Sequence, residues 1–166
     1  MRESFMRIIT ATVEEAEQIY NMVQHTIRTV YPKYYPKEVV DFFCELHSKE
    51  NITKDIKNGC VVTLQEENDK GHLLGTGSYK DNHITRVYVE PEFQGKGYGS
   101  YIMQYLEEQI GIKYDAVYLD ASLPASQLYE NRGYKTVKHE KWPVANGVIL
   151  VYEVMEKMVN SMSVFT

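Results

Sequence analysis

The sequence predicts an α/β fold with a mixed sheet, formed by one domain over residues 1–166 with its core at about 6–157. Three observations carry this prediction. Apolar runs with strand-like and with helix-like periodicity alternate along the chain. Strand-like runs at 60–65 and 73–80 are joined by a polar turn at 66–71, which is typical of an antiparallel pair. Alternating glycines then separate a further strand-like run from an amphipathic helical run.

The N-terminal half begins with a short strand and continues mostly as helices. Thr12 and Glu15 have the spacing of a capping box, which marks the start of a helix. Pro32 and Pro36 interrupt the helical pattern, because proline disfavours helical backbone in the residue before it. We expect a strand at 7–10, helices at 12–30, 37–47 and 51–58, and the two antiparallel strands at 60–65 and 73–80.

The C-terminal half alternates strands and helices. A strand at 84–89 must end before Pro91, because proline cannot donate a ladder hydrogen bond. The next helix is predicted from apolar residues at helical spacing, namely Ile102, Met103, Leu106 and Ile110. We then expect a strand at 116–120, a helix at 124–131, strands at 134–140 and 148–153, and a frayed tail at 161–166.

The segment Gln94-Gly95-Lys96-Gly97-Tyr98-Gly99 places three glycines directly before a predicted helix start. Free N–H groups and the positive end of the helix dipole meet there, so an anion such as a diphosphate is the expected ligand. A nucleoside-triphosphate loop needs Ser or Thr after Gly-Lys, and the spacing of the second and third glycines differs from the dinucleotide fingerprint. A glycine-rich turn without a ligand is the remaining alternative.

Two stretches carry a family resemblance. Val87-Tyr88-Val89-Glu90-Pro91-Glu92-Phe93 and the glycine segment that follows resemble the acetyl-CoA-binding signature of the GNAT superfamily of acyl-CoA N-acyltransferases. Leu119-Asp120-Ala121-Ser122 and the run from Ala125 to Tyr134 resemble the fifth strand and following helix of that family. The resemblance covers almost the whole chain. It implies a mixed, mostly antiparallel, twisted sheet flanked by helices on both faces, with acetyl-CoA as cofactor.

The resemblance also implies which residues bind acetyl-CoA. The backbone of Val87, Tyr88 and Val89 would bind the pantetheine arm, and residues 94–99 would hold the pyrophosphate. Lys96 either adds a charge contact or is a solvated side chain in the turn. Ser122 stands where many family members carry asparagine, and its hydroxyl can contact the cofactor.

Amide formation from a thioester needs a base for the ammonium and a proton donor for the leaving thiolate. Tyr129 stands at the family's donor position, and the alternative is that it packs on the cofactor or core. His83 opens the strand that carries Val87, and imidazole titrates near neutral pH, which suits a base. The alternatives for the base are Glu90, Asp120 and a relay of ordered water, with His83 then only a partly exposed residue at a strand start.

The acceptor site is expected beside the loop between the first two helices. Tyr31, Tyr34 and Tyr35 in that loop and Tyr79 on a nearby strand are the candidate lining residues, and aromatic faces favour a cation. Alternatively, the loop tyrosines pack the helices over the sheet. Trp142 is a further candidate at the border of the pocket.

Composition limits the partners and the compartment. A net charge of −5 argues against nucleic acid and only weakly suggests a cationic amine. We expect no metal site, since the two cysteines lack metal-ligand spacing. Without a long apolar stretch or a signal-peptide core, we expect a cytoplasmic protein that does not bind membranes. Homodimers through the C-terminal strands are common in the family, so a homodimer is one expectation.

We therefore expect an N-acetyltransferase that transfers an acetyl group from acetyl-CoA to a primary amine of a small molecule, by direct attack in a ternary complex. A protein or peptide N-acetyltransferase is one alternative. An acyl-CoA-binding sensor module without catalysis is the other, and it would keep the cofactor loop but have no use for a proton donor at Tyr129.

Overall fold

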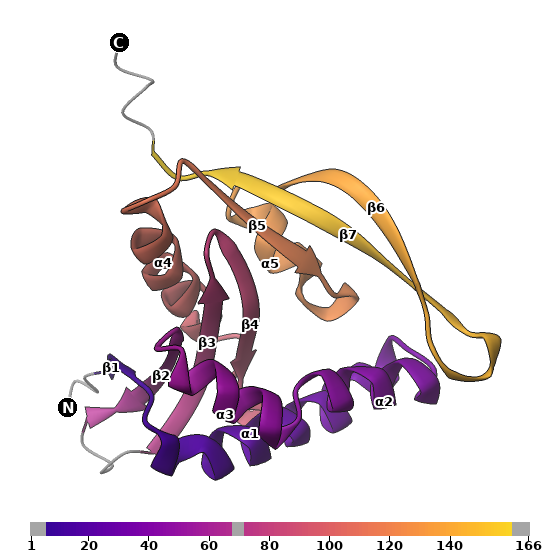
Figure 1. The fold of residues 1–166 in the computed structure, drawn as a ribbon, viewed down its shortest axis with the longest axis horizontal. Coiled ribbons are helices and arrows are strands. Elements are labelled where there is room, and N and C mark those ends of the chain that lie inside the picture. The colour runs from indigo at the N-terminus through magenta and orange to yellow at the C-terminus, as the bar shows by residue number, and fades with distance from the viewer. Residues whose placement is uncertain (1–5, 68–71, 161–166) are drawn as a thin grey trace.

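A computed structural model describes residues 6–67 and 72–160 of the chain (Figure 1). The tail predicted to be frayed and most of the turn predicted at 66–71 lie outside these ranges. Within the described residues, three α-helices lie on one face of a sheet and two on the other. No helix among them is long and apolar enough to cross a lipid bilayer.

The strands form one mixed sheet in the order β1-β2-β3-β4-β5-β7-β6. Every neighbouring pair is antiparallel except β4 and β5, which are parallel. The predicted mixed, mostly antiparallel sheet is thus confirmed. The strands are β1 (Met6–Thr10), β2 (Val61–Glu66), β3 (His72–Lys80), β4 (His83–Val89), β5 (Ala116–Ala121), β6 (Lys135–Pro143) and β7 (Ile149–Met158).

The helices cover both faces of the sheet, as predicted. The capping box forms at the first helix, because the Thr12 N–H donates to Glu15 Oε1 at 2.9 Å. The third helix begins two residues earlier than predicted, since Ser48 Oγ caps it by accepting from the Asn51 N–H at 3.1 Å. One face carries α1 (Ala16–Val30), α2 (Lys37–Leu46) and α3 (Lys49–Lys57), and the other carries α4 (Tyr98–Gly111) and α5 (Ser126–Asn131).

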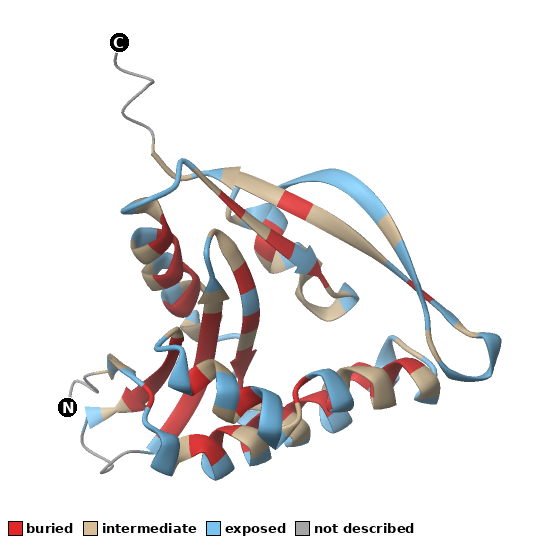
Figure 2. Cartoon of the chain, viewed as in Figure 1, coloured by how far each residue is buried: buried red, intermediate tan, exposed pale blue. Residues whose placement is uncertain are grey.

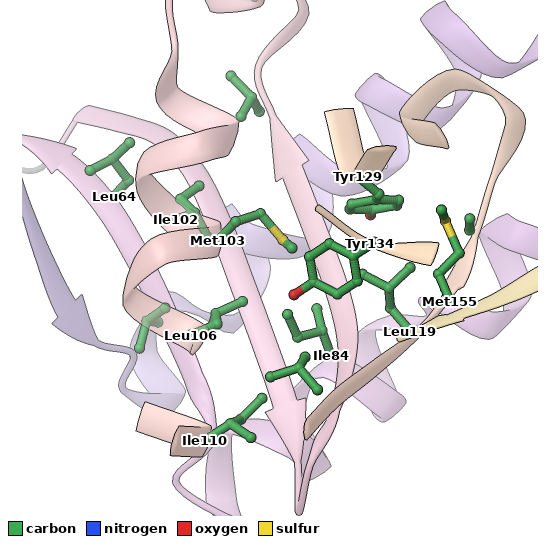
Figure 3. Packing of buried hydrophobic residues seen from close by; sticks show 14 of the residues in the cluster. Leu64, Ile84, Ile102, Met103, Leu106, Ile110, Leu119, Tyr129, Tyr134 and Met155 are labelled. Carbon is green, nitrogen blue, oxygen red and sulfur yellow. The ribbon is translucent and has the colours of Figure 1, made fainter. Parts of the chain in front are cut away.

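Two hydrophobic cores fill the space between the helices and the sheet (Figure 2). The core under α4 and α5 contains Ile102, Leu106 and Tyr129, and Figure 3 shows it from close by. Gly75 and Gly77 on β3 make this packing possible. A Cβ at Gly77 would lie 2.6 Å from Ile102 Cγ2, and one at Gly75 would lie 2.9 Å from a backbone carbonyl oxygen. These glycines therefore let α4 lie close against the sheet.

The parallel pair β4–β5 separates soon after it begins. His83 pairs with Tyr118 and Ile84 with Leu119, and no further β4–β5 pairs form in the described chain. The rest of β4, up to Val89, pairs with β3 on its other side. The sheet therefore splays open beside the second half of β4, where its backbone can meet a ligand.

The last two strands are longer than predicted. Beyond the end of β5, β6 and β7 continue as a two-stranded hairpin that reaches toward α2 (Figure 1). Its residues are mostly exposed, among them Lys141, Trp142 and Val151. A two-stranded ribbon without a helix on its outer face shows no clear apolar alternation, so its full length is hard to read from the sequence.

Candidate active site

Two cavities meet where β4 and β5 separate. The first, of about 480 Å³, lies between the glycine segment and the start of α5. The second, of about 410 Å³, lies between β4, β5 and the helices α2 and α3. They share a wall formed by Tyr31, Val87, Tyr88, Ser122 and Ala125. A ligand in each cavity could therefore react across this junction.

The first cavity has the features of an anion site at its glycine end. Gly95 and Gly97 adopt left-handed backbone with φ of +80° and +86°, and a Cβ on either would meet no atom within 4 Å. The first backbone bond of α4 runs from the Tyr101 N–H to the Gly97 carbonyl at 3.0 Å. The preceding N–H groups at the helix start have no partner within the helix, so they are available to an anion.

The predicted cofactor residues converge on this cavity, with one exception. It is lined by Val87, Tyr88, Val89, Gln94, Gly95, Gly97, Tyr98, Gly99 and Ser122. The Gln94 amide donates to the Val89 carbonyl at 3.0 Å and so ties the loop to the end of β4. Lys96 is not part of the lining, because its ammonium lies over the Phe93 ring, 5.4 Å from the ring centroid. Its charge stays beside the loop and outside the cavity.

Phenol groups surround the junction. The Tyr31 hydroxyl lies 3.2 Å from the Tyr88 hydroxyl and 3.4 Å from Ser122 Oγ. Burial raises the pKa of Tyr31 and of Tyr88, so both phenols stay protonated at neutral pH. Burial also raises the pKa of Tyr35, to about 12, and its hydroxyl accepts a hydrogen bond from the Leu123 N–H at 2.7 Å. These contacts hold the loop after α1 against the start of α5.

Tyr129, the predicted proton donor, lines the second cavity from α5. Its side chain is only 6% exposed, and its ring packs edge-on against Tyr134 with the centroids 6.0 Å apart. Burial raises the pKa of Tyr129, so the hydroxyl keeps its proton at neutral pH. That hydroxyl makes no hydrogen bond to any described residue. A neutral phenol with an uncommitted O–H at a cavity wall is suited to donate a proton.

His83, the predicted base, lies in the same cavity and is paired with a carboxylate. Its Nε2 is 3.7 Å from Asp120 Oδ2, and both side chains are partly exposed. Asp120, an alternative base from the sequence, is thus the carboxylate neighbour of His83 in this cavity. Glu90, another alternative, lies in a separate small cavity with His72, away from Tyr129.

The four tyrosines predicted for the acceptor site are only partly brought together. Tyr31 lines both cavities, Tyr34 lines the first cavity alone, and Tyr35 lines neither. Tyr79 also lines neither. Its neighbour Ser78 faces Arg86 on the α3 side, and successive strand residues alternate faces, so Tyr79 packs on the core under α4. Trp142 is 53% exposed on the hairpin and lines neither cavity.

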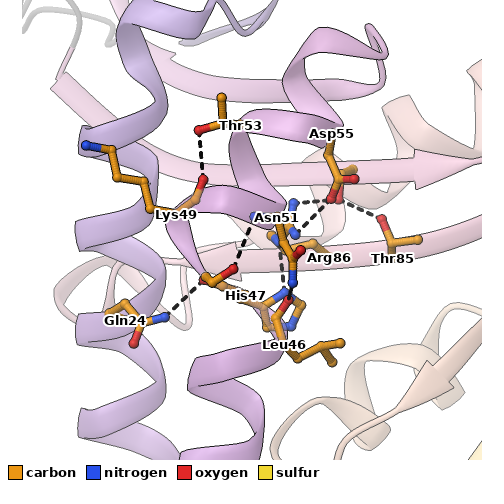
Figure 4. A network of polar contacts seen from close by, with 11 residues as sticks. Gln24, Leu46, His47, Lys49, Asn51, Thr53, Asp55, Thr85 and Arg86 are labelled. Carbon is orange, nitrogen blue, oxygen red and sulfur yellow. Dashed lines mark hydrogen bonds and ion pairs between the residues drawn. The ribbon is translucent and has the colours of Figure 1, made fainter.

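Sequence reasoning missed a buried polar network in the wall of the second cavity. Arg86 on β4 contacts His47 at the end of α2 and Asp55 on α3, as Figure 4 shows. Burial, with a smaller contribution from the Arg86 charge, lowers the pKa of His47 to about 3, so this imidazole is neutral at pH 7. The available signal was Arg86 itself, a lone charged residue within an apolar strand run.

Known proteins of the same architecture were found by comparison of sequence and of structure. The sequence model of the acetyltransferase (GNAT) domain matches residues 30–157. Comparison with curated proteins gave no match.

A crystal structure from Rhodopseudomonas palustris, described as a GCN5-related N-acetyltransferase and class-II aminotransferase, is 20% identical, with a TM-score of 0.81 over 95% of this chain and 97% of that chain. PaiA N-acetyltransferase from Thermoplasma acidophilum, in complex with coenzyme A, is 18% identical, with a TM-score of 0.70 over 93% of this chain and 99% of that chain.

YncA from Salmonella typhimurium, solved with its cofactor acetyl-CoA, is 17% identical, with a TM-score of 0.69 over 95% of each chain. At such identities the structural likeness establishes the fold. The sequence match covers most of the chain and establishes the family. The chain belongs to the GNAT acetyltransferase family.

Proposed function

We propose that this protein is an N-acetyltransferase that transfers an acetyl group from acetyl-CoA to the primary amine of a small molecule within a ternary complex. The observation that carries the proposal is the pair of cavities that share one wall, with the anion site in the first and Tyr129 and His83 in the second. Family membership supports acetyl-CoA as the acyl donor.

The first cavity fits coenzyme A in its chemistry. Open backbone at Gly95 and Gly97 and the free N–H groups of α4 would hold a pyrophosphate. The backbone of Val87 to Val89 faces the gap where β4 and β5 separate. The pantetheine arm, which carries amide groups, would hydrogen-bond to this backbone as a neighbouring strand does. When bound, acetyl-CoA supplies an activated acyl group as its thioester.

His83 would prepare the acceptor for attack. An alkylammonium has a pKa near 10 and must lose a proton before its nitrogen can attack a carbonyl. His83 lines the second cavity, where its Nε2 lies 3.7 Å from Asp120 Oδ2, and its imidazole would take that proton. The amine nitrogen then bonds to the thioester carbonyl carbon.

Tyr129 would complete the reaction as the proton donor. As the carbon–sulfur bond breaks, the leaving thiolate would need a proton, and the attacking nitrogen would release its second proton to solvent to become the amide nitrogen. The Tyr129 hydroxyl is neutral and uncommitted at the wall of the acceptor cavity. It would donate its proton to the sulfur and regain one from the protonated base by way of solvent.

The size of the second cavity supports a small acceptor. A volume of about 410 Å³ lies within the range of small-molecule sites, which is roughly 300–1,000 Å³. A protein acceptor and a sensor without catalysis are the competing outcomes of the test described next.

The test compares Tyr129→Phe with a matched control, Tyr114→Phe, which changes a tyrosine that lines neither cavity. Calorimetry should give unchanged acetyl-CoA affinity for both variants. Thiol release with an amine acceptor should fall about 100-fold or more in Tyr129→Phe alone, because a general acid contributes roughly 10²–10⁴ in rate. Unchanged turnover would refute the donor role. Tight acetyl-CoA binding without thiol release for any amine would favour the sensor, and release only with peptides would favour a protein acceptor.

A further inference from the structure

The second cavity, which is the proposed acceptor cavity, has a charge pattern that differs from that of the whole chain. The chain carries a net charge of −5. The cavity lining, in contrast, includes the cationic side chains of Lys54, Lys80 and Arg86 and only two carboxylates, Asp55 and Asp120. Because charges that line a cavity act on a ligand at close range, this local pattern bears on the acceptor more than the net charge does.

Arg86 is a buried cation with unused hydrogen-bonding capacity. Its side chain is 3% exposed. Nε donates to His47 Nδ1 at 3.0 Å and Nη2 to Asp55 Oδ2 at 3.0 Å (Figure 4). Nη1 donates to Ser78 Oγ at 3.2 Å. A guanidinium has five N–H donors, so two are not used by these contacts. Of the three partners, Asp55 alone carries a negative charge, and its side chain is 38% exposed.

Two lysines add positive charge to the lining of the same cavity. Lys54 precedes Asp55 on α3, and Lys80 ends β3, opposite His83 on β4. Both line the cavity, and neither lies within 4 Å of a carboxylate in the part of the chain that the structure describes. Neither ammonium is therefore held in an ion pair with a described residue, and together with Arg86 the two lysines give the cavity a cationic wall.

The other charged pair in the cavity has the opposite preference. Asp120 lies beside His83 and would attract the ammonium group of the acceptor. His83 and Arg86 are three residues apart on β4, which separates their Cα atoms by about 10 Å. One acceptor molecule could therefore place its amine at His83 and a second charged group at the cationic wall.

We propose that the acceptor is a small zwitterion, an amine that also carries a carboxylate or phosphate, and that Arg86, Lys54 and Lys80 bind this acidic group. The inference rests on the proposed function and adds a substrate class to it. A polyamine, with a second cation in place of the acid, would meet repulsion at the same wall. Arg86 is suited to the recognition itself, because its planar guanidinium matches the geometry of carboxylate and phosphate oxygens.

The test uses pairs of amines that differ only in the acidic group. Thiol release from acetyl-CoA would be measured with cadaverine and lysine, with tyramine and tyrosine, and with ethanolamine and phosphoethanolamine. We expect the acidic member of at least one pair to have a kcat/KM roughly 10-fold higher or more, as a charge-assisted contact provides. The first two pairs report on a carboxylate and the third on a phosphate, so the result also names the acid.

Variants test whether the cationic wall causes the preference for an acceptor with an acidic group. The double variant Lys54→Gln with Lys80→Gln changes exposed side chains and should lower the acid-to-amine kcat/KM ratio by roughly 10-fold, mainly through KM for the acidic acceptor. Lys57→Gln, which removes a lysine from the same helix outside the cavity lining, should leave the ratio unchanged. Arg86→Lys keeps the charge but loses the planar fork, and it should lower the ratio as well.

The outcomes separate this inference from the proposed function. If the acid-free amines react as well as or better than their acidic partners, the zwitterion inference is overturned and the acetyltransferase stands. An acid preference that survives in the double lysine variant and in Arg86→Lys would overturn the assignment of the cationic wall. If no amine of either kind releases thiol although acetyl-CoA binds, the proposed function itself fails and the inference with it.

Discussion

The clearest quantitative prediction concerns Glu107, a buried carboxylate on α4. Its side chain is 8% exposed and forms an ion pair with Arg132, just after α5. It also accepts a hydrogen bond from the Tyr134 hydroxyl at 2.8 Å and one from Lys157 Nζ on β7 at 3.3 Å. One carboxylate thus connects α4, the end of α5 and β7.

The change Glu107→Ala would leave two cations without their counter-ion. The side chains of Arg132 and Lys157 are 18% and 26% exposed, and Glu107 is the only carboxylate paired with either in the described chain. Breaking a buried ion pair from one side costs about 3–5 kcal/mol. Because both cations keep some access to water, we expect the lower end, a loss of about 3 kcal/mol in the free energy of unfolding.

Urea unfolding at neutral pH measures this loss. The matched control is Glu17→Ala, which removes a carboxylate paired with Lys49 at 2.6 Å on the surface, with the two side chains 67% and 52% exposed. Solvent screens that pair, so we expect no resolvable loss in the control. If both variants lose the same stability, the reasoning that burial sets the energy of this network is refuted.

A second measurement tests the link to the site. The backbone N–H of Tyr134 donates to the Tyr129 carbonyl at 3.0 Å, and the two rings pack together. Loosening the Glu107 contacts should therefore move Tyr129. We expect kcat to fall more than KM for acetyl-CoA rises, in conditions where the variant is fully folded. Parallel changes in both constants would instead indicate a general loss of structure.

Three further predictions follow from named contacts. Gly77→Ala should destabilise the fold by about 1–3 kcal/mol, because its Cβ would lie 2.6 Å from Ile102 Cγ2 under α4. An unchanged melting temperature would contradict this. His47 has its pKa lowered to about 3, so the wild type should lose stability below pH 6.5 with an added slope approaching 1.4 kcal/mol per pH unit. In urea unfolding between pH 4 and pH 7, His47→Asn, which can still accept from Arg86, should lack that added slope, and equal slopes would count against a buried neutral imidazole. Gly97→Val should weaken acetyl-CoA binding in calorimetry at least about 10-fold. The φ of +86° strains a β-branched residue, and the valine side chain would occupy the open space at the loop. Unaltered affinity would argue against the anion site.

Local sequence determined the features that depend on neighbouring residues. The glycine segment and the start of α4 could be predicted because left-handed turns and helix starts are set by a few adjacent residues. His83 and Tyr129 line one cavity, and their catalytic roles are predictions that came from the resemblance. The strand and helix order was read from periodicity, with small shifts such as the earlier cap at Ser48.

Only the tertiary structure decided which side chains share a cavity. Tyr79 was expected at the acceptor site but packs under α4, because the face that a strand residue occupies depends on register with its neighbours. Arg86 acquires its role from His47 and Asp55, which lie 39 and 31 residues away along the chain. Gly77 matters because α4 approaches it closely. Contacts between distant segments come from the packing of whole helices on the sheet, and no local pattern in the sequence encodes them.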